Sequence, residues 1–216
     1  DWPMFRYDEG RTGVSPTAIP STLYLTWVKE LPRLKRAWPD DTTDIKQDMD
    51  ESYVPVIAGK SLFIVSSRTG SLAAYDTDTG AKQWEFFTNA PVRVSPAVYN
   101  GDVFVLSDDG YLYSLRASDG VLNWKFNAAP RDRKILGNSN LISTWPGRGG
   151  PVISSDGTLY FAAGLFPFMG CYLYSMDPST GNVNWVNDSN TSFYMDQPHT
   201  VAGFGGIAPN GNFAIN

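Results

Sequence analysis

The chain has 216 residues, 42% of them hydrophobic and 18% charged, and 17 Lys and Arg against 22 Asp and Glu give a net charge of −5. This acidic balance lacks the basic field that sequence-independent nucleic-acid binding and anionic membrane surfaces require, so neither partner is expected. No apolar run is long enough for a transmembrane helix. The single Cys171 excludes an intrachain disulfide and multi-Cys metal sites, and the single His199 excludes chemistry with two imidazoles.

The first 52 residues contain one predicted strand and one acidic stretch. Residues 23–31 (LYLTWVKEL) resemble the Trp-bearing strands of the repeats that follow, and we expect them to form an outer strand of another repeat unit. Asp48, Asp50 and Glu51 belong to the acidic stretch. Their oxygens could hold a hard cation such as Ca²⁺, but a charge run is more often a solvated loop, and we favour the loop.

Three copies of one pattern follow, in residues 53–87, 94–127 and 150–187. In each copy a Pro introduces a short apolar strand, which is followed by a Gly turn, two more strands and a turn with a Gly four residues before a Trp. Trp84 and Trp124 are 124 − 84 = 40 residues apart, the length of a four-stranded propeller blade. The sequence therefore predicts an all-β protein, a β-propeller of four-stranded blades. The Gly and Trp pairs are Gly80 with Trp84, Gly120 with Trp124 and Gly181 with Trp185.

This pattern also predicts which strands lie inside and what closes the ends. We expect inner strands near residues 53–58, 94–99 and 150–154, and burial of the three repeat Trp side chains on outer strands between adjacent blades. Residues 206–216 look like the start of a further blade. Because an open arc of blades leaves two apolar faces wet, we expect the chain to be part of a larger propeller.

The residues of the first copy are specific enough to suggest a family. Ala74, Asp76, Thr79, Gly80 and Trp84 match the Ala-x-Asp-x-x-Thr-Gly-x-x-x-Trp motif, and the repeat resembles that of the PQQ-like (quinoprotein-like) β-propellers, in particular large exported bacterial ones. The resemblance implies seven or eight blades and a place outside the cytoplasm, in the periplasm, in the cell envelope or secreted. This family includes quinoprotein dehydrogenases and binding or assembly propellers. The enzymes' vicinal Cys pair cannot form with one Cys, so bound PQQ is not expected.

Two long links are the places where a site is expected. In a propeller the link from an outer strand to the next inner strand crosses one face, and long links are commonly functional. Those around residues 127–150 and 187–208 are the longest. We predict that Arg148 and His199 converge at the channel mouth. The other candidate ligand-binding residues are Trp145, as the wall of the pocket, and Asp132 and Asp196, to balance charge.

Each candidate has a simpler alternative. Arg148 could clamp a carboxylate or quinone oxygens, or it could fix a loop by bonding backbone carbonyls. His199 could ligate a metal or act as a general acid or base, although a lone His is more often structural. Trp145, which lies outside the repeat, is the candidate for stacking on a ligand, unless the links simply pack on each other.

These observations lead us to expect a non-enzymatic, exported binding or scaffold propeller. Its partner would be another protein or the remaining part of the propeller, with a small molecule or a saccharide as further candidates. The alternative is a propeller enzyme, either a quinoprotein-type oxidoreductase or a lyase, with its site at the channel mouth. No metal site or catalytic residue is assigned.

Overall fold

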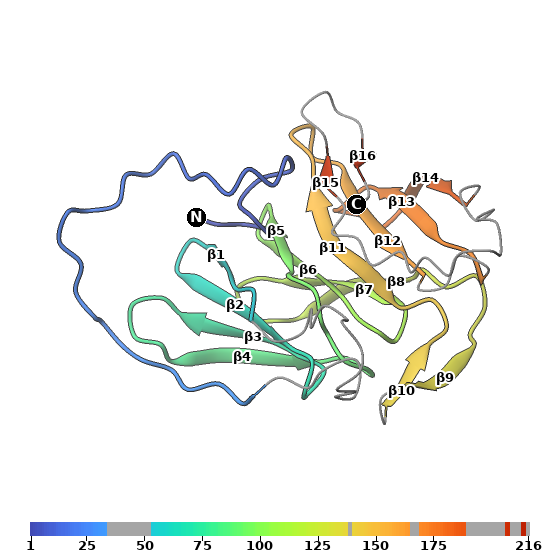
Figure 1. The fold of residues 1–216 in the computed structure, drawn as a ribbon, viewed down its shortest axis with the longest axis horizontal. Helices are drawn as coiled ribbons and strands as arrows, with labels where there is room; N and C mark the ends of the chain where they lie inside the picture. The colour runs from blue at the N-terminus through green and yellow to red at the C-terminus, as the bar shows by residue number, and fades with distance from the viewer. Residues whose placement is uncertain (34–52, 138–139, 165–168, 189–205, 208–212, 215–216) are drawn as a thin grey trace, which may run out of the picture.

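The fold is built from antiparallel sheets that follow one another in chain order (Figure 1). The structure is a computed structural model, and it describes residues 1–33, 53–137, 140–164, 169–188, 206–207 and 213–214. The described part contains three four-stranded and two two-stranded sheets, which confirms the all-β class and the four-stranded blade. No helix in these ranges is long and apolar enough to cross a membrane.

Each four-stranded sheet is a simple meander in which every strand pairs with the next. The first blade consists of β1 Val56–Ala58, β2 Ser61–Ser66, β3 Ser71–Asp76 and β4 Lys82–Phe87. The second consists of β5 Ala97–Tyr99, β6 Asp102–Leu106, β7 Tyr111–Arg116 and β8 Leu122–Asn127. The third consists of β11 Gly147–Ile153, β12 Leu159–Ala163, β13 Tyr172–Met176 and β14 Val183–Asn187. The first strands β1, β5 and β11 contact one another in that order and are therefore the inner strands.

The third inner strand begins earlier than the expected residues 150–154. Gly147 and Arg148 already pair with β12, and a bulge follows before pairing resumes at Val152. Gly149 and Gly150 form this bulge with φ of 82° and 70°, a backbone region that favours Gly. The strand therefore absorbs the end of the link, which the apolar pattern alone did not indicate.

Two small sheets lie outside the three blades. In the 127–150 link, β9 Lys134–Gly137 pairs with β10 Asn140–Ser143, where we had expected only a long connection. Near the C-terminus, β15 Gly206–Ile207 pairs with β16 Phe213–Ala214, within the segment in which we expected a further blade to start.

Each blade has a glycine turn that is covered by a tryptophan from the segment preceding that blade. A Cβ atom added at Gly120 would lie 2.5 Å from the Trp84 ring, a distance that excludes any side chain. The φ of Gly120 is 72°, so the turn requires glycine for its backbone as well. Gly80 and Gly181 are covered in the same way by Trp27 and Trp124. Each indole N–H donates to the carbonyl three residues before the glycine: Trp27 to Thr77 (2.8 Å), Trp84 to Ala117 (3.0 Å) and Trp124 to Pro178 (3.0 Å).

We call this contact between a tryptophan ring and a glycine turn the interlock, and it corrects two expectations. Residues 23–31 form no strand in the structure. Trp27 nevertheless contacts the glycine turn of the first blade in the same way as Trp84 and Trp124 contact the turns of the second and third blades. Trp84 and Trp124 are half-buried, but the expected burial of Trp185 is wrong, because this side chain is 44% exposed. In the described ranges Trp185 meets only its own sheet, against Tyr160, and no glycine turn covers its outer side.

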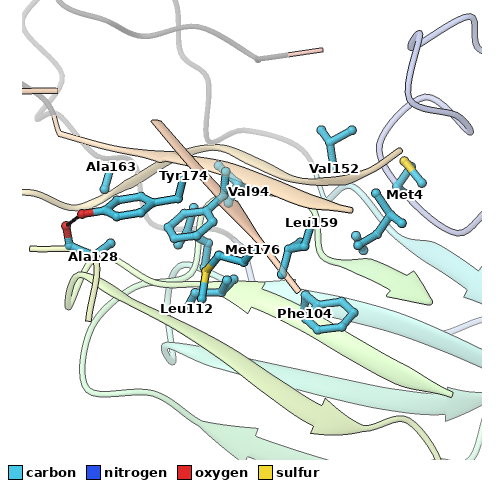
Figure 2. Close-up of a cluster of buried hydrophobic side chains, with 14 residues drawn as sticks. Met4, Val94, Phe104, Leu112, Ala128, Val152, Leu159, Ala163, Tyr174 and Met176 are labelled. Atoms are coloured by element: carbon cyan, nitrogen blue, oxygen red, sulfur yellow. Dashed lines mark hydrogen bonds between the residues drawn. The ribbon is translucent and has the colours of Figure 1, made fainter. Parts of the chain in front are cut away.

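Two clusters of buried side chains lie between neighbouring blades, and a smaller third one, of Ile64, Ala73 and Tyr75, belongs to the first blade. Of the two larger clusters, one joins the first and second blades through buried side chains such as Phe63, Leu72 and Leu115. The other joins the second and third blades, and Figure 2 shows Leu112 facing Leu159 and Met176 across this boundary. The Tyr174 hydroxyl crosses the same boundary and donates to the carbonyl oxygen of Ala128 at 2.9 Å. Blade faces therefore bury their apolar side chains against their neighbours.

Residues 1–13, which we call the N-terminal strap, run along the inner strands of all three blades. Figure 2 shows its Met4 at the edge of the second cluster, beside Val152. The strap uses the backbone groups that the inner strands leave unpaired, a requirement of any exposed sheet edge. Its backbone partners are Ile57 for Trp2 (2.7 and 2.9 Å) and Val98 for Pro3 (2.7 Å), and the Arg11 side chain reaches Gly149 (2.9 Å).

The interlock predicts unequal costs for tryptophan removal. Trp124→Ala should lower the free energy of unfolding by about 3 kcal/mol, since it opens a cavity over Gly181 and removes a hydrogen bond. Trp185→Ala should cost about 1 kcal/mol or less, because its outer side is not covered. Denaturant titrations of both variants measure the difference. Equal losses would contradict the role of the glycine turn.

Burial of Tyr174 predicts a loss of stability at alkaline pH. Desolvation raises the pKa of Tyr174 from its ordinary value of 10.0 to about 12. The neutral phenol is therefore favoured by the fold, and its contribution is complete below pH 10 and is lost as the pH rises from 10 to 12. Tyr174→Phe should lose less stability over this interval than the parent chain. Tyr24→Phe, at an exposed position, should follow the parent curve in the same titration.

Candidate functional site

The links and the β2–β3 and β6–β7 turns meet at one end of the blades. We call this region, residues 67–70, 88–96, 107–110, 128–137 and 140–146, the link end. Backbone hydrogen bonds tie it together: the Asp108 N–H donates to Pro91 at 2.8 Å, and the Ser143 N–H donates to Asp108 at 2.8 Å. The link end therefore forms one packed surface over the first and second blades.

At its centre a buried carboxylate binds two arginines. Asp108 accepts a hydrogen bond from Arg93 Nε at 2.7 Å and another from Arg148 Nη1 at 2.8 Å. The three side chains are 3%, 7% and 15% exposed. Arg148 Nη1 also donates to the carbonyl of Gly147 at 2.7 Å. Arg148 therefore connects the β6–β7 turn to the start of β11, which favours the loop-fixing alternative for this residue.

The neighbouring Asp109 is also engaged. Its carboxylate accepts from the Tyr113 hydroxyl at 2.6 Å, from the Asn89 N–H at 3.1 Å and from the Tyr111 N–H at 2.9 Å. Burial, followed by the hydrogen bond to Asp109, raises the pKa of Tyr113 above its ordinary range. Sequence reasoning missed both aspartates, because Asp-Asp-Gly reads as an ordinary hairpin turn.

The other predicted site residues fall into three situations. Trp145 is 5% exposed and its indole N–H donates to the Met169 carbonyl at 2.8 Å, so its ring is packed within the protein. Asp132 is exposed to solvent. His199 and Asp196 lie outside the described residues, as does the acidic stretch with Asp48, Asp50 and Glu51. The convergence of Arg148 and His199 therefore stays a prediction.

The arginine predicted to clamp quinone oxygens is already paired in the structure. A tricarboxylate such as PQQ requires free cationic donors, and Arg148 is already bonded to Asp108 and Gly147. Within the described ranges, no three His, Cys, Asp or Glu side chains are grouped to hold a metal ion. Cys171 is a free thiol whose pKa is raised by burial, an environment that disfavours the reactive thiolate.

The hairpin β9–β10 is the most exposed apolar feature of the link end. Leu136 and Leu141 pair across the two strands, and their side chains are 79% and 57% exposed. Exposed cationic side chains stand next to them in the chain. These are Arg131, Arg133 and Lys134. The sequence analysis missed this hairpin, for which the available signal was one apolar pair in each of KILG and NLIS, separated by two residues.

Comparison with known proteins agrees with the blade architecture. Residues 35–193 match the model of a family described as outer membrane protein assembly factor BamB. No curated protein sequence matches the chain significantly.

Solved structures with similar folds include an assembly factor and two dehydrogenases. BamB from Moraxella catarrhalis aligns over 70% of this chain and 42% of its own, with 18% identity and a TM-score of 0.51. A europium-containing methanol dehydrogenase aligns over 97% of this chain and 40% of its own, with 18% identity and a TM-score of 0.59. The quinohemoprotein alcohol dehydrogenase from Comamonas testosteroni aligns over 88% and 27%, with 19% identity and a TM-score of 0.57. The chain thus spans less than half the length of each, and the likeness shows the fold.

The buried carboxylate predicts a large cost for its neutralisation. Asp108→Asn should lower the free energy of unfolding by about 3–5 kcal/mol, because it leaves the Arg93 and Arg148 charges without their shared anion. Asp78→Asn, which removes the solvent-exposed partner of Lys60, is the matched control and should leave the denaturation midpoint unchanged. A midpoint equally unaffected in Asp108→Asn would show that the cluster does not hold the link end together.

Proposed function

Because the chain belongs to the family described as outer membrane protein assembly factor BamB, we propose that it is a non-enzymatic binding or scaffold propeller that holds another protein at its link end. The family description also supports a place outside the cytoplasm, in the cell envelope. The remaining part of a larger propeller is a second candidate partner, since the aligned part of this chain covers only 42% and 40% of two solved structures.

The observation that carries this proposal is the exposed leucine pair of hairpin β9–β10. Two adjacent leucine side chains that are exposed to water do not gain the favourable free energy of apolar burial. Such patches on protein surfaces mark interaction sites. The surrounding Arg131, Arg133 and Lys134 favour a partner surface that combines apolar and acidic residues.

The charged groups of the link end have a different role in this proposal. Asp108 uses both carboxylate oxygens on arginines, and the Arg148 group contacts a backbone carbonyl as well. A saccharide or another small molecule at this end is not supported by the packed Trp145 ring or by the paired Arg148. The Asp108 cluster with its two arginines fixes the link that carries the hairpin.

A propeller oxidoreductase is the competing function, and the fold likeness to the two dehydrogenases favours it. That reading requires a site formed with His199 at the channel mouth, and it predicts stoichiometric quinone binding to the purified protein. Absorption spectra after addition of PQQ and Ca²⁺, followed by dye reduction with primary alcohols, test it directly.

The scaffold proposal is tested by changing the leucine pair. The variant Leu136→Asp/Leu141→Asp should lose a cross-linked protein partner that the parent chain captures in envelope extracts, as identified by mass spectrometry. Its thermal unfolding should not change, because both side chains are exposed. Val121→Asp, at a 49% exposed position on the β7–β8 turn, is the control and should keep the partner. Retention of the partner by the double variant, or alcohol-dependent dye reduction by the parent, would contradict the proposal.

A further inference from the structure

A second site is indicated by an arginine in the N-terminal strap that lacks partners. Among the described residues, the buried side-chain atoms without a hydrogen-bond partner are Arg11 Nε, Arg11 Nη1 and the hydroxyl of Ser114. A covered hydroxyl is a modest cost, whereas a covered guanidinium without an anion is a large one. Unsatisfied buried groups of this kind commonly mark a missing ion or ligand.

The Arg11 guanidinium is held in place by groups that do not neutralise it. Nη2 donates to the Gly149 carbonyl at 2.9 Å, on the bulge of β11. Its central carbon lies 4.9 Å from the centroid of the Phe5 ring, and the Arg6 guanidinium lies 5.8 Å from the same centroid. Two cations thus share one aromatic ring. Burial, and then the Arg6 charge, lowers the pKa of Arg11 to about 10.

Asp8 and Glu9 of the strap accept hydrogen bonds from groups other than the two arginines. Both oxygens of Asp8 accept hydrogen bonds from Thr12, from its N–H at 2.8 Å and from its hydroxyl at 2.5 Å. Glu9 accepts from the backbone N–H of Ser155 at 2.5 Å. In the part of the chain that the structure describes, no ion pair joins a carboxylate to Arg6 or Arg11. Among these residues, neither arginine therefore has a carboxylate within ion-pair distance.

The backbone of the strap is strained where it carries these arginines. Arg6, Tyr7 and Arg11 have φ of 57°, 83° and 53°, values that non-glycine residues rarely adopt. Backbone hydrogen bonds close the loop, from the Tyr7 N–H to Met4 and from the Gly13 N–H to Arg6. Strain of this kind persists where the surroundings enforce it, and it is frequent at ligand clamps.

We propose that residues 5–13 form an oxyanion site, specific for a carboxylate, in which Arg11 provides the donors and Arg6 closes over the bound group. Nη2 uses one of its two N–H groups on Gly149, so its other N–H and the free N–H of the neighbouring Nε or Nη1 form a planar pair of donors that matches the oxygens of a carboxylate. Arg6 is exposed and Arg11 is partly buried, so the group enters from the Arg6 side. Its entry requires the loop to shift, and the strained φ values lower the cost of that shift.

This site is separate from the leucine pair of the link end and goes beyond the scaffold function. The carboxylate can belong to a free small molecule or to an Asp or Glu side chain of a polypeptide segment docked against the inner strands. Both sources supply the same group, and one experiment on two forms of the protein separates them.

The test is thermal unfolding of the 216-residue chain in acetate, chloride and inorganic phosphate at matched ionic strength. Acetate at about 100 mM should raise the unfolding temperature by about 2–4 °C relative to chloride, as expected for a weak ligand that binds the folded state alone. Phosphate should give a smaller shift. Equal unfolding temperatures in the three salts would overturn the carboxylate assignment.

Two variants and one control connect the shift to the loop. In chloride, Arg11→Met should unfold at the same temperature as the parent chain or higher, because it removes an unpaired buried charge, and it should lose the acetate response. Arg6→Met should reduce that response, whereas Arg131→Met, at an exposed cation on the link end, should keep it. A lower unfolding temperature of Arg11→Met in chloride would instead make Arg11 a structural residue. If Arg11→Met does not fold, an unchanged acetate response in Arg6→Met overturns the proposal and a reduced one supports it.

The same titration on the natural polypeptide that contains these residues identifies the source of the carboxylate. An acetate response in both forms indicates a free ligand. A response in the 216-residue chain alone indicates that a side chain present only in the natural polypeptide fills the site. Both outcomes support an oxyanion site, and the absence of a response in both forms overturns it.

Discussion

The contact between a tryptophan ring and the glycine turn of the next blade is the constraint on which this architecture depends. Gly120 has room for neither a side chain nor a different backbone conformation, because the Trp84 ring lies where its Cβ would be. The indole N–H then fixes the ring against the same turn. This contact joins the outer edges of neighbouring blades, and the apolar clusters join their faces. The angle between two neighbouring blades is therefore set by their own contacts.

A blade fixed in this way can tolerate long links without changing its packing. The second and third blades share the same strand order, although the link between them contains the hairpin β9–β10. The link is anchored by Asp108, whose two arginines come from the segments before β5 and at the start of β11. Asp108 and its two arginines thus help to position the exposed leucines of the hairpin. A similar division between anchoring polar groups and exposed contact groups is typical of surfaces that bind proteins.

The repeat made the blade predictable, and features outside the repeat were harder to predict. Gly and Trp at fixed spacing identified the strands, because each residue meets a local requirement of turn or packing. Arg148 was recognised as important, but its partner Asp108 was not, since a turn aspartate carries no sign that it will be buried. The exposure of Trp185 was missed because burial there depends on a following turn, a non-local condition. The inner course of residues 1–13 was missed for the same reason, since no periodic pattern marks it.

The N-terminal strap has a consequence for how the blades unfold. A linear array of repeats with contacts only between neighbours can fray from its ends, one unit at a time. Residues 1–13 bond to β1, β5 and β11 together, so opening any one blade also loosens a segment shared by the other two. This shared segment lengthens the average sequence separation of native contacts, which slows folding. It also converts three local equilibria into one cooperative transition, so that the arc resists stepwise fraying.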